Sequence, residues 1–423
     1  MIGGGRAAGG SAAPFAWRRW ATWQTGLAAL VLASASFSIA VNQISLGLAL
    51  LLLLLRGATT RRWPPATPAL WPAVALTVWA LGMVPLSTDP DQSLVFFRRF
   101  FLLTAFWVTL AVATGPRHRW ILFGGLACGA VGVAAWGIGS GLVADGGLFR
   151  HRFIGTVNAM TNGILMLMAF LVALGFVVRG GGGRRRRALL ITVAAVLGLA
   201  VLLTQTRSAL MGVVAGVGAM VLLARPRRFL VFAAVVAVLT GAVYGSGGRI
   251  VPDRLWHRIA PETLLGESSG FATRFEMWRG GWEMVKDRPL TGVGDRDLRA
   301  LGPRYYGDAD TTFHGHLHSN PVMLAAIWGV PGFLLASLYL LVPLLLLVRR
   351  WRDEVRGGGA DPALAAWLLG GVGVWAGFAV AGLTEWYFGD AEAMVLYLAI
   401  LGTALGRTAG PAATGAAAGP PAA

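Results

Sequence analysis

The residues best suited to chemistry lie in the stretch FHGHLHSN from Phe313 to Asn320, which holds half of the chain's six histidines. His314, His316 and His318 alternate with other residues, so on an extended segment their side chains would point to one face. Three imidazoles on one face can bind zinc. One imidazole paired with a carboxylate can instead act as a general base near neutral pH, and an ordinary polar loop is the third possibility. The pattern favours a general base at His318 or His316, and we expect no metal and no cofactor.

Arginines form the second group with a chemical use. Guanidinium groups bind phosphate oxygens in a bidentate manner and keep their charge, so several at one level would hold a diphosphate. Arg98 and Arg99 lie about two helical turns inside an apolar stretch, where charge is costly unless it faces an aqueous cavity or reaches the lipid headgroups. The arginines expected on the same face as the histidines are Arg98, Arg99, Arg150, Arg152 and Arg207.

The composition indicates a membrane protein. The 423 residues are 56% hydrophobic and 13% charged, which is far from a soluble globular composition. The formal net charge of +17 could suggest nucleic acid, but the basic residues cluster between apolar runs, which indicates anchoring on anionic lipid. We therefore expect no nucleic-acid partner. The single cysteine, Cys128, lies in an apolar run and offers neither a disulfide framework nor a cysteine metal site.

The apolar runs predict an all-α fold with about twelve membrane-spanning helices, because each run is close to the roughly 20 residues that one span needs. Residues 1–244 are predicted to hold nine helices, 245–319 one large loop with the histidines, 320–406 three more helices, and 407–423 a disordered tail. The expected spans are two within 20–55, then 69–86, 93–113, 120–143, 158–178, 188–206, 208–224, 229–244, 320–350, 363–383 and 391–405.

The distribution of charge predicts the orientation. Twelve spans place both termini on one side, and loops rich in arginine mark the cytoplasmic side. The basic groups at 56–62, 117–119, 179–187, 225–228 and 349–356, with the chain ends, hold more than half of the 36 basic residues. Only three acidic residues oppose them, so both termini are expected in the cytoplasm. The large loop and the histidines are then extracytoplasmic.

Four further segments carry recognisable motifs. They are RFIGT at 152–156, TQTRS at 204–208, RFEMW at 274–278 with DRPLTGVG at 287–294, and HLHSN at 316–320 with WGVPG at 328–332. Together they resemble elements of the O-antigen ligase and polymerase superfamily of bacterial inner-membrane proteins. That family often has Asn directly after the histidine, whereas Ser319 stands between His318 and Asn320 here. His318 and His316 therefore both remain candidates, and His318 is favoured because it is nearer the helix start.

The resemblance implies a metal-independent glycosyltransferase of the C type in the bacterial inner membrane, with a periplasmic active site. It would transfer a glycan from undecaprenyl diphosphate to a hydroxyl of the lipid A core, with inversion at the anomeric carbon. His318 would take the acceptor proton. Arg152 and Arg207 would neutralise the leaving diphosphate, helped by residues among Arg98, Arg99, Arg150, Arg274 and Arg288.

Three alternatives stay open at this stage. Within the family, the chain could be a polymerase that extends the glycan or an oligosaccharyltransferase that acts on protein Ser or Thr. From a different class, it could be a flippase or transporter for a lipid-linked sugar, although such proteins usually show internal repeats, and none is evident here. The loop is expected to be helical over 274–285, where Phe275, Trp278 and Trp282 share one side. This stripe is interpreted as packing or interfacial docking in preference to a sugar platform.

Overall fold

The computed structural model describes residues 13–61, 63–64, 66–145, 152–153, 155–265, 270–306 and 315–407. Within these ranges the chain is helical and contains no β-strand, which confirms the all-α prediction. The predicted tail lies, apart from Arg407, outside the described residues. The helices of the bundle are α1 (Ala13–Ser34), α2 (Ile39–Thr60), α3 (Leu70–Met83), α4 (Pro90–Phe97), α5 (Thr104–Val112), α6 (Pro116–Asp145), α7 (Ala159–Arg179), α8 (Arg184–Thr204), α9 (Arg207–Ala224), α10 (Phe229–Gly245), α15 (Asn320–Arg350), α16 (Pro362–Ala381) and α17 (Ala391–Leu405).

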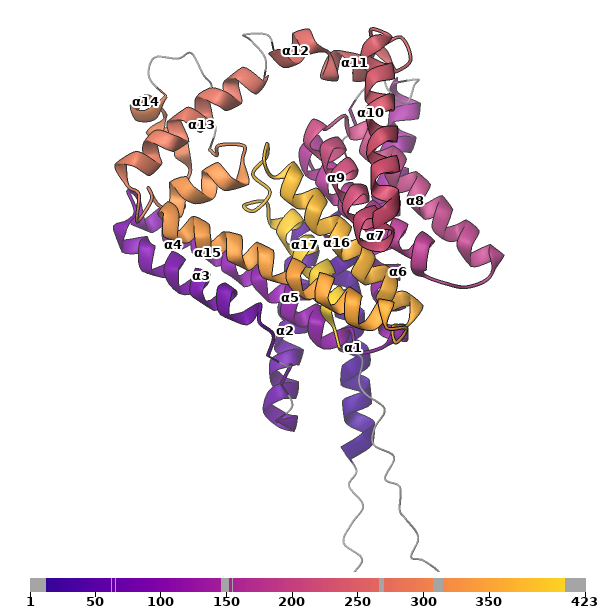
Figure 1. The fold of residues 1–423 in the computed structure, drawn as a ribbon. Coiled ribbons are helices and arrows are strands. Elements are labelled where there is room, and N and C mark those ends of the chain that lie inside the picture. Colours follow the sequence, from indigo (N-terminus) through magenta and orange to yellow (C-terminus); the bar gives the residue numbers. More distant parts are fainter. Residues whose placement is uncertain are drawn as a thin grey trace, which may run out of the picture.

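Four further helices lie between α10 and α15 and bridge one end of the bundle, as Figure 1 shows. They are α11 (Asp253–Ile259), α12 (Pro261–Leu265), α13 (Gly270–Asp287) and α14 (Gly302–Tyr305). The predicted helix over 274–285 is confirmed as part of α13. Short 3-10 or π segments complete the list: η1 (Val84–Leu86), η2 (Arg98–Leu103), η3 (Pro226–Arg228), η4 (Leu298–Leu301) and η5 (Trp351–Arg356).

Nine helical segments among the described residues are long and apolar enough to cross a membrane. Two shorter apolar helices, Leu70–Leu86 and Ala391–Leu405, accompany them. A helix lies at each of the twelve predicted stretches. Among the described residues only these nine are long and apolar enough to count as spans, so the number of twelve stays a prediction. One of the nine, Pro90–Val112, is made of α4, η2 and α5 in succession.

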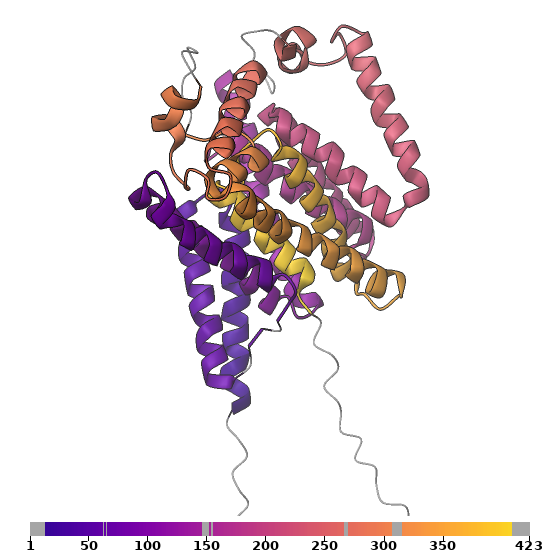
Figure 2. The ribbon, with the colours of Figure 1, turned by 60° about the vertical axis from the view of Figure 1, so that its left-hand side comes forward.

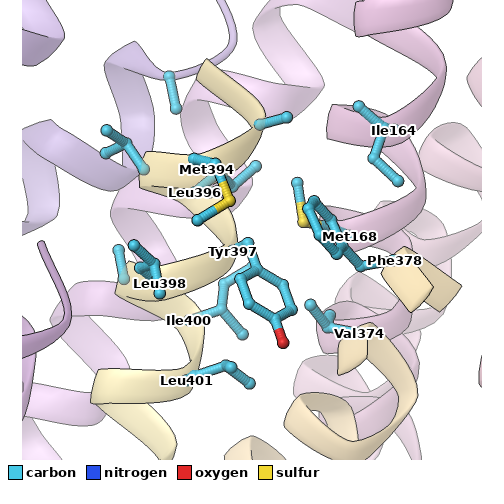
Figure 3. Packing of buried hydrophobic residues seen from close by; sticks show 14 of the residues in the cluster. Ile164, Met168, Val374, Phe378, Met394, Leu396, Tyr397, Leu398, Ile400 and Leu401 are labelled. Carbon is cyan, nitrogen blue, oxygen red and sulfur yellow. The ribbon is translucent and has the colours of Figure 1, made fainter. Parts of the chain in front are cut away.

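The centre of the bundle is formed by α7, α16 and α17, whose side chains are the most completely buried. Figure 3 shows Tyr397 and Leu401 of α17 facing Met168 of α7 and Phe378 of α16. The rings of Phe378 and Tyr397 are stacked with their centroids 4.3 Å apart. Because dispersion contacts of this kind need close complementary shapes, this trio provides the rigid frame on which the outer helices pack.

Small residues let α9 approach α16 closely. Gly212 and Gly216 of α9 lie opposite Gly377 and Gly373 of α16, and a Cβ at Gly212 or Gly216 would stand 2.9 or 2.8 Å from the facing carbonyl oxygen. Such spacing of glycines every four residues is a common way for membrane helices to pack, since apolar burial alone does not drive their association in lipid. The start of α9 is thereby fixed relative to the end of α16.

By contrast, α10 has no buried residue and packs mainly against α9 at the side of the bundle (Figures 1 and 2). It leads directly into the bridging helices α11 and α12.

The loop after α13 is fastened to a kink in α15. Gly329 has φ +68° and ψ −178°, a backbone conformation outside the helical range. Backbone groups of α15 at the kink form hydrogen bonds with the loop in place of helical ones. The N–H of Val293 donates to Ala326 O at 2.8 Å, and the N–H of Val330 donates to Pro289 O at 2.8 Å. The segment around Val293, part of the DRPLTGVG motif, therefore holds the large loop against α15.

A buried arginine ties the opposite end of the bundle together. The Arg119 side chain is completely buried; it donates to Asp361 Oδ2 at 2.8 Å and to Gly406 O at 2.8 Å. The sequence groups Arg119 with the basic residues of the cytoplasmic face, but its guanidinium joins the starts of α6 and α16 to the end of α17.

We predict that Arg119→Met lowers the melting temperature of the protein in detergent, with a loss of roughly 3 kcal/mol of stability, because it leaves Asp361 and buried carbonyl groups without their donor. The measurement is a thermal unfolding scan. Arg117→Met is the matched control, since Arg117 is exposed. Equal melting temperatures for the two variants would contradict the structural role of Arg119.

We also predict that Gly329→Ala destabilises the protein by at least about 1 kcal/mol, because φ is positive there and the new Cβ would stand 2.5 Å from the Leu290 carbonyl. The change should release the large loop from α15 and increase its proteolysis between α13 and α15. Gly82→Ala serves as control because Gly82 is helical and nothing lies within 4 Å of its added Cβ. Equal proteolysis of the two variants would show that the kink does not hold the loop.

Candidate functional site

A cavity of about 620 Å³ lies at the end of the bundle covered by the bridging helices. Its lining includes His316 and His318, the start of α7, the polar segment 295–299 and the segment 385–390 between α16 and α17. It combines apolar walls with converging polar groups, as binding sites do.

The centre of this site is a pair of side chains, His318 and Glu385. His318 Nδ1 lies 2.8 Å from Glu385 Oε2, and both side chains are largely buried. Arg274 of α13 donates from Nη2 to the other carboxylate oxygen of Glu385. One carboxylate thus joins the histidine segment to the loop helix and to the end of α16.

Asn320 positions the two partners relative to each other. Its backbone N–H donates to Gly382 O at 2.7 Å, and its side-chain oxygen accepts from the N–H of Phe388 at 2.9 Å. These two bonds hold the segment with Glu385 against the start of α15, directly after His318. The Asn of the HLHSN motif therefore has a positioning role here.

The histidine segment is also fixed from the other side. Trp278 of α13 donates from its indole nitrogen to Leu317 O at 3.0 Å, and the Leu317 side chain is completely buried. His318 has φ +47°, a left-handed conformation that is uncommon for a residue other than glycine and is often found at functional sites. The His316 and His318 rings lie 4.2 Å apart.

The aromatic stripe of α13 divides in the structure. Trp278 faces the histidine segment, whereas Phe275 and Trp282 remain 57% and 60% exposed. The packing interpretation therefore holds for Trp278, and the other two side chains are available to an interface.

The electrostatics favour an ionised Glu385. Burial alone would raise the pKa of Glu385. The hydrogen bond from His318 and the charges of His318 and Arg274 lower it by more than burial raises it, so the pKa lies below its usual value. A carboxylate at Nδ1 stabilises the tautomer that carries hydrogen on Nδ1 and a lone pair on Nε2, and it also stabilises the imidazolium formed when Nε2 takes a proton. The pair is therefore arranged as a general base and its orienting acid.

Arg152 and Arg207 lie together at the turn between α8 and α9, outside the cavity lining. Arg152 donates from Nε to Thr204 O at 3.0 Å and from Nη2 to Thr206 Oγ1 at 3.1 Å. In the part of the chain that the structure describes, neither arginine is ion-paired with a carboxylate. Burial lowers the pKa of Arg152 and the positive charges of Arg258 and Arg207 add to this effect, while the negative charge of Glu385 opposes it in part. Neither guanidinium group is therefore neutralised by an ion pair of its own among the described residues.

This turn adjoins the cavity wall. Ser208, the residue after Arg207, lies with its Oγ 2.9 Å from the Tyr387 hydroxyl, and Tyr387 lines the cavity. Burial raises the pKa of Tyr387 well above its usual value, so its hydroxyl stays protonated. A charged group bound at Arg152 and Arg207 would therefore sit behind the wall that carries Glu385.

The other predicted arginines fall in different places. Arg99 lines the cavity and forms an ion pair with Asp295 at 3.4 Å, whereas Arg98 is exposed and does not line it. Arg288 donates to Leu86 O at 2.9 Å, away from the lining. Arg150 and His314 lie outside the described residues. Among the described residues no group of three His, Cys, Asp or Glu side chains could hold a metal ion.

Sequence reasoning missed Glu385 and Asp295 as members of the site. Burial raises the pKa of Asp295 to about 6, and the charge of Arg99 offsets this only in part. A signal existed for Glu385, which stands as a single carboxylate at the end of an apolar stretch, where an ionisable residue indicates function. Asp295 gave no such signal, because it lies among other charged residues of a polar loop.

We predict that the stability contributed by Glu385 depends on pH. Its pKa in the folded state lies below the usual 4.5, so its contribution is present above pH 4.5 and is lost as pH falls through the folded-state pKa. The difference in melting temperature between wild type and Glu385→Gln should therefore shrink at low pH. Thermal scans from about pH 7 to about pH 3 measure it, with Glu283→Gln as control because Glu283 is exposed. A difference unchanged down to the lowest pH would contradict an ionised Glu385.

Comparison with known proteins bears on this site. Residues 192–337 match the family model described as O-antigen ligase, a range that contains α9, the bridging helices and the histidine segment. The match confirms the resemblance found in the motifs and supports membership of the O-antigen ligase family, whose members are glycosyltransferase-like ligases and polymerases. Together with the apolar helices, it indicates an integral membrane protein. No curated protein sequence matches the chain.

Proposed function

We propose that this protein is an O-antigen ligase of the bacterial inner membrane. It transfers a glycan from undecaprenyl diphosphate to a hydroxyl of the lipid A core on the periplasmic face, with both termini in the cytoplasm. The observation that carries the proposal is the His318–Glu385 pair, which opens on a cavity of about 620 Å³ within an arginine-rich end of the bundle. The family match supports the reaction class.

In the proposed reaction the acceptor hydroxyl donates its proton to Nε2 of His318 as its oxygen attacks the anomeric carbon of the donor glycan. The bond from that carbon to the diphosphate oxygen breaks, and the electron pair leaves with the diphosphate. Glu385 stabilises the imidazolium that forms. Displacement in one step inverts the anomeric centre.

The departing diphosphate gains negative charge as the bond breaks, and fixed positive groups that meet this charge lower the barrier. Arg152 and Arg207 suit this role because, among the described residues, neither forms an ion pair with a carboxylate. Arg98 is a further candidate, and Arg150, which lies outside the described residues, stays a candidate from its place in the sequence. Arg274 acts through Glu385. Arg288 is the weakest candidate, because its guanidinium is engaged by the Leu86 carbonyl at 2.9 Å. No step in this scheme requires a metal or a cofactor.

We predict that His318→Ala lowers the transfer rate about a thousandfold and Arg207→Ala about a hundredfold, as expected for loss of a general base and of one group that stabilises the leaving group. The measurement is glycan transfer by the purified protein in liposomes, with undecaprenyl diphosphate-linked glycan and lipid A core. Activity should be unchanged by a chelator. His316→Ala separates the two histidines, and a larger effect there would move the base to His316.

The controls are His257→Ala and Arg279→Ala, which remove exposed side chains of the same loop. Full activity of His318→Ala would remove the general base from the proposal. Extension of the lipid-linked glycan itself, without transfer to lipid A core, would identify a polymerase. Transfer to a protein Ser or Thr would identify an oligosaccharyltransferase, and movement of the lipid-linked sugar across the bilayer without any transfer would identify a flippase.

A further inference from the structure

The polar segment from Asp295 to Arg299, which we term the charged ledge, forms one side of the cavity. Four of its five residues line the cavity, and Leu298, which does not, is completely buried. The function proposed above assigns no role to these residues. They are close to His318 in space, because the Leu298 N–H donates to the carbonyl of Gly315 at 3.1 Å.

The arginines that line the cavity are each paired with a carboxylate. Arg99 lies 3.4 Å from Asp295, and Arg299 lies 3.1 Å from Asp297. Arg296 lies 3.6 Å from Asp89 of the turn before α4. The ledge therefore presents alternating donors and acceptors whose charges nearly cancel.

This pairing of charges distinguishes the ledge from the α8–α9 turn, at which Arg152 and Arg207 lie. A diphosphate brings several negative charges, which carboxylates repel and unpaired guanidinium groups attract. A sugar hydroxyl both donates and accepts hydrogen bonds, so it suits a surface on which carboxylate oxygens and guanidinium N–H groups alternate. The guanidinium groups without an ion pair fit the diphosphate, and the ion-paired ledge fits a polyhydroxylated ligand.

The ledge is held in place without any ligand. The Asp297 N–H donates to the side-chain oxygen of Gln92 on α4. Arg296 donates to Thr88 Oγ1 at 3.2 Å, and the Asp297 carboxylate caps the next turn by accepting from the N–H of Arg299 at 2.9 Å. A site fixed in advance loses little conformational entropy when a flexible saccharide binds.

Other residues of the cavity lining carry groups of the type that bind saccharides. Trp386 offers part of an aromatic surface, and Asp390 and Asn158 add polar oxygens. Asp390 is itself fixed by Thr161, whose hydroxyl donates to it at 2.6 Å. The cavity lining thus combines polar groups from several segments with an aromatic side chain and with His318.

We propose that this cavity is the acceptor subsite, and that the charged ledge binds hydroxyl groups of the acceptor saccharide. The inference rests on the function proposed above. The diphosphate of the donor then lies at the turn between α8 and α9, and the acceptor reaches His318 from the side of the ledge. Arg99, predicted from the sequence as a phosphate ligand, belongs to the acceptor side in this arrangement.

The test measures acceptor and donor binding separately. We expect Arg299→Ala to weaken binding of lipid A core oligosaccharide to the full-length protein about tenfold, the value for one lost hydrogen bond to a charged group. It should raise the acceptor KM by a similar factor and leave binding of undecaprenyl diphosphate within about twofold of wild type. Arg299→Lys should recover part of the acceptor affinity. The Arg299 side chain is 68% exposed, so its removal should not impair folding.

Arg304→Ala is the matched control, because Arg304 also forms an exposed pair in the same loop, with Asp287, but does not line the cavity. A change in donor affinity without a change in acceptor affinity for Arg299→Ala would assign the ledge to the diphosphate and overturn the inference. Unchanged acceptor binding would also overturn it. Absence of transfer by the wild-type protein would contradict the proposed reaction alone, since acceptor binding is measured without donor.

Discussion

The structure of the site depends on the burial of one carboxylate, Glu385. An ionised side chain that is only 5% exposed is costly unless charged partners and hydrogen bonds compensate for the lost water. His318 and Arg274 supply that compensation, and they come from segments that are distant in the chain. Satisfying this one charge therefore requires the histidine segment, α13 and the loop before α17 to meet at one point.

A second feature of the structure is that some of its arginines form ion pairs with carboxylates and others do not. The arginines of the cavity are neutralised by neighbouring carboxylates, whereas Arg152 at the α8–α9 turn is held by a carbonyl and a hydroxyl, and neither it nor Arg207 forms an ion pair among the described residues. The glycine seam between α9 and α16 links the two regions mechanically, because it fixes the position of Arg207 relative to the segment that carries Glu385. An enzyme that moves a glycan from a charged diphosphate to an acceptor hydroxyl benefits from keeping these two environments separate.

Much of this could be predicted from the sequence, and the reasons are local. The apolar runs, the helix over 274–285 and the chemistry of the histidine segment follow from composition and spacing within a few residues. The pairing of His318 with Glu385 could not be read in this way, because 67 positions separate the two residues and α15 and α16 intervene. Adjacent Arg98 and Arg99 look equivalent in sequence, but the 3-10 segment that begins there turns only Arg99 toward Asp295. Its sequence neighbours suggest that Arg119 is a surface charge, but in the fold the end of α17 covers it.

The position of α10 has a consequence for how this protein is handled. A helix with no buried residue that packs mainly against α9 leaves most of its surface to the surrounding lipid. Its far end carries α11 and α12, which bridge to α13 and hence to Trp278 and Arg274. The thickness and lateral pressure of the bilayer thus act on α10, and α11 to α13 connect α10 to the histidine segment. A detergent micelle surrounds α10 differently from a membrane of native composition.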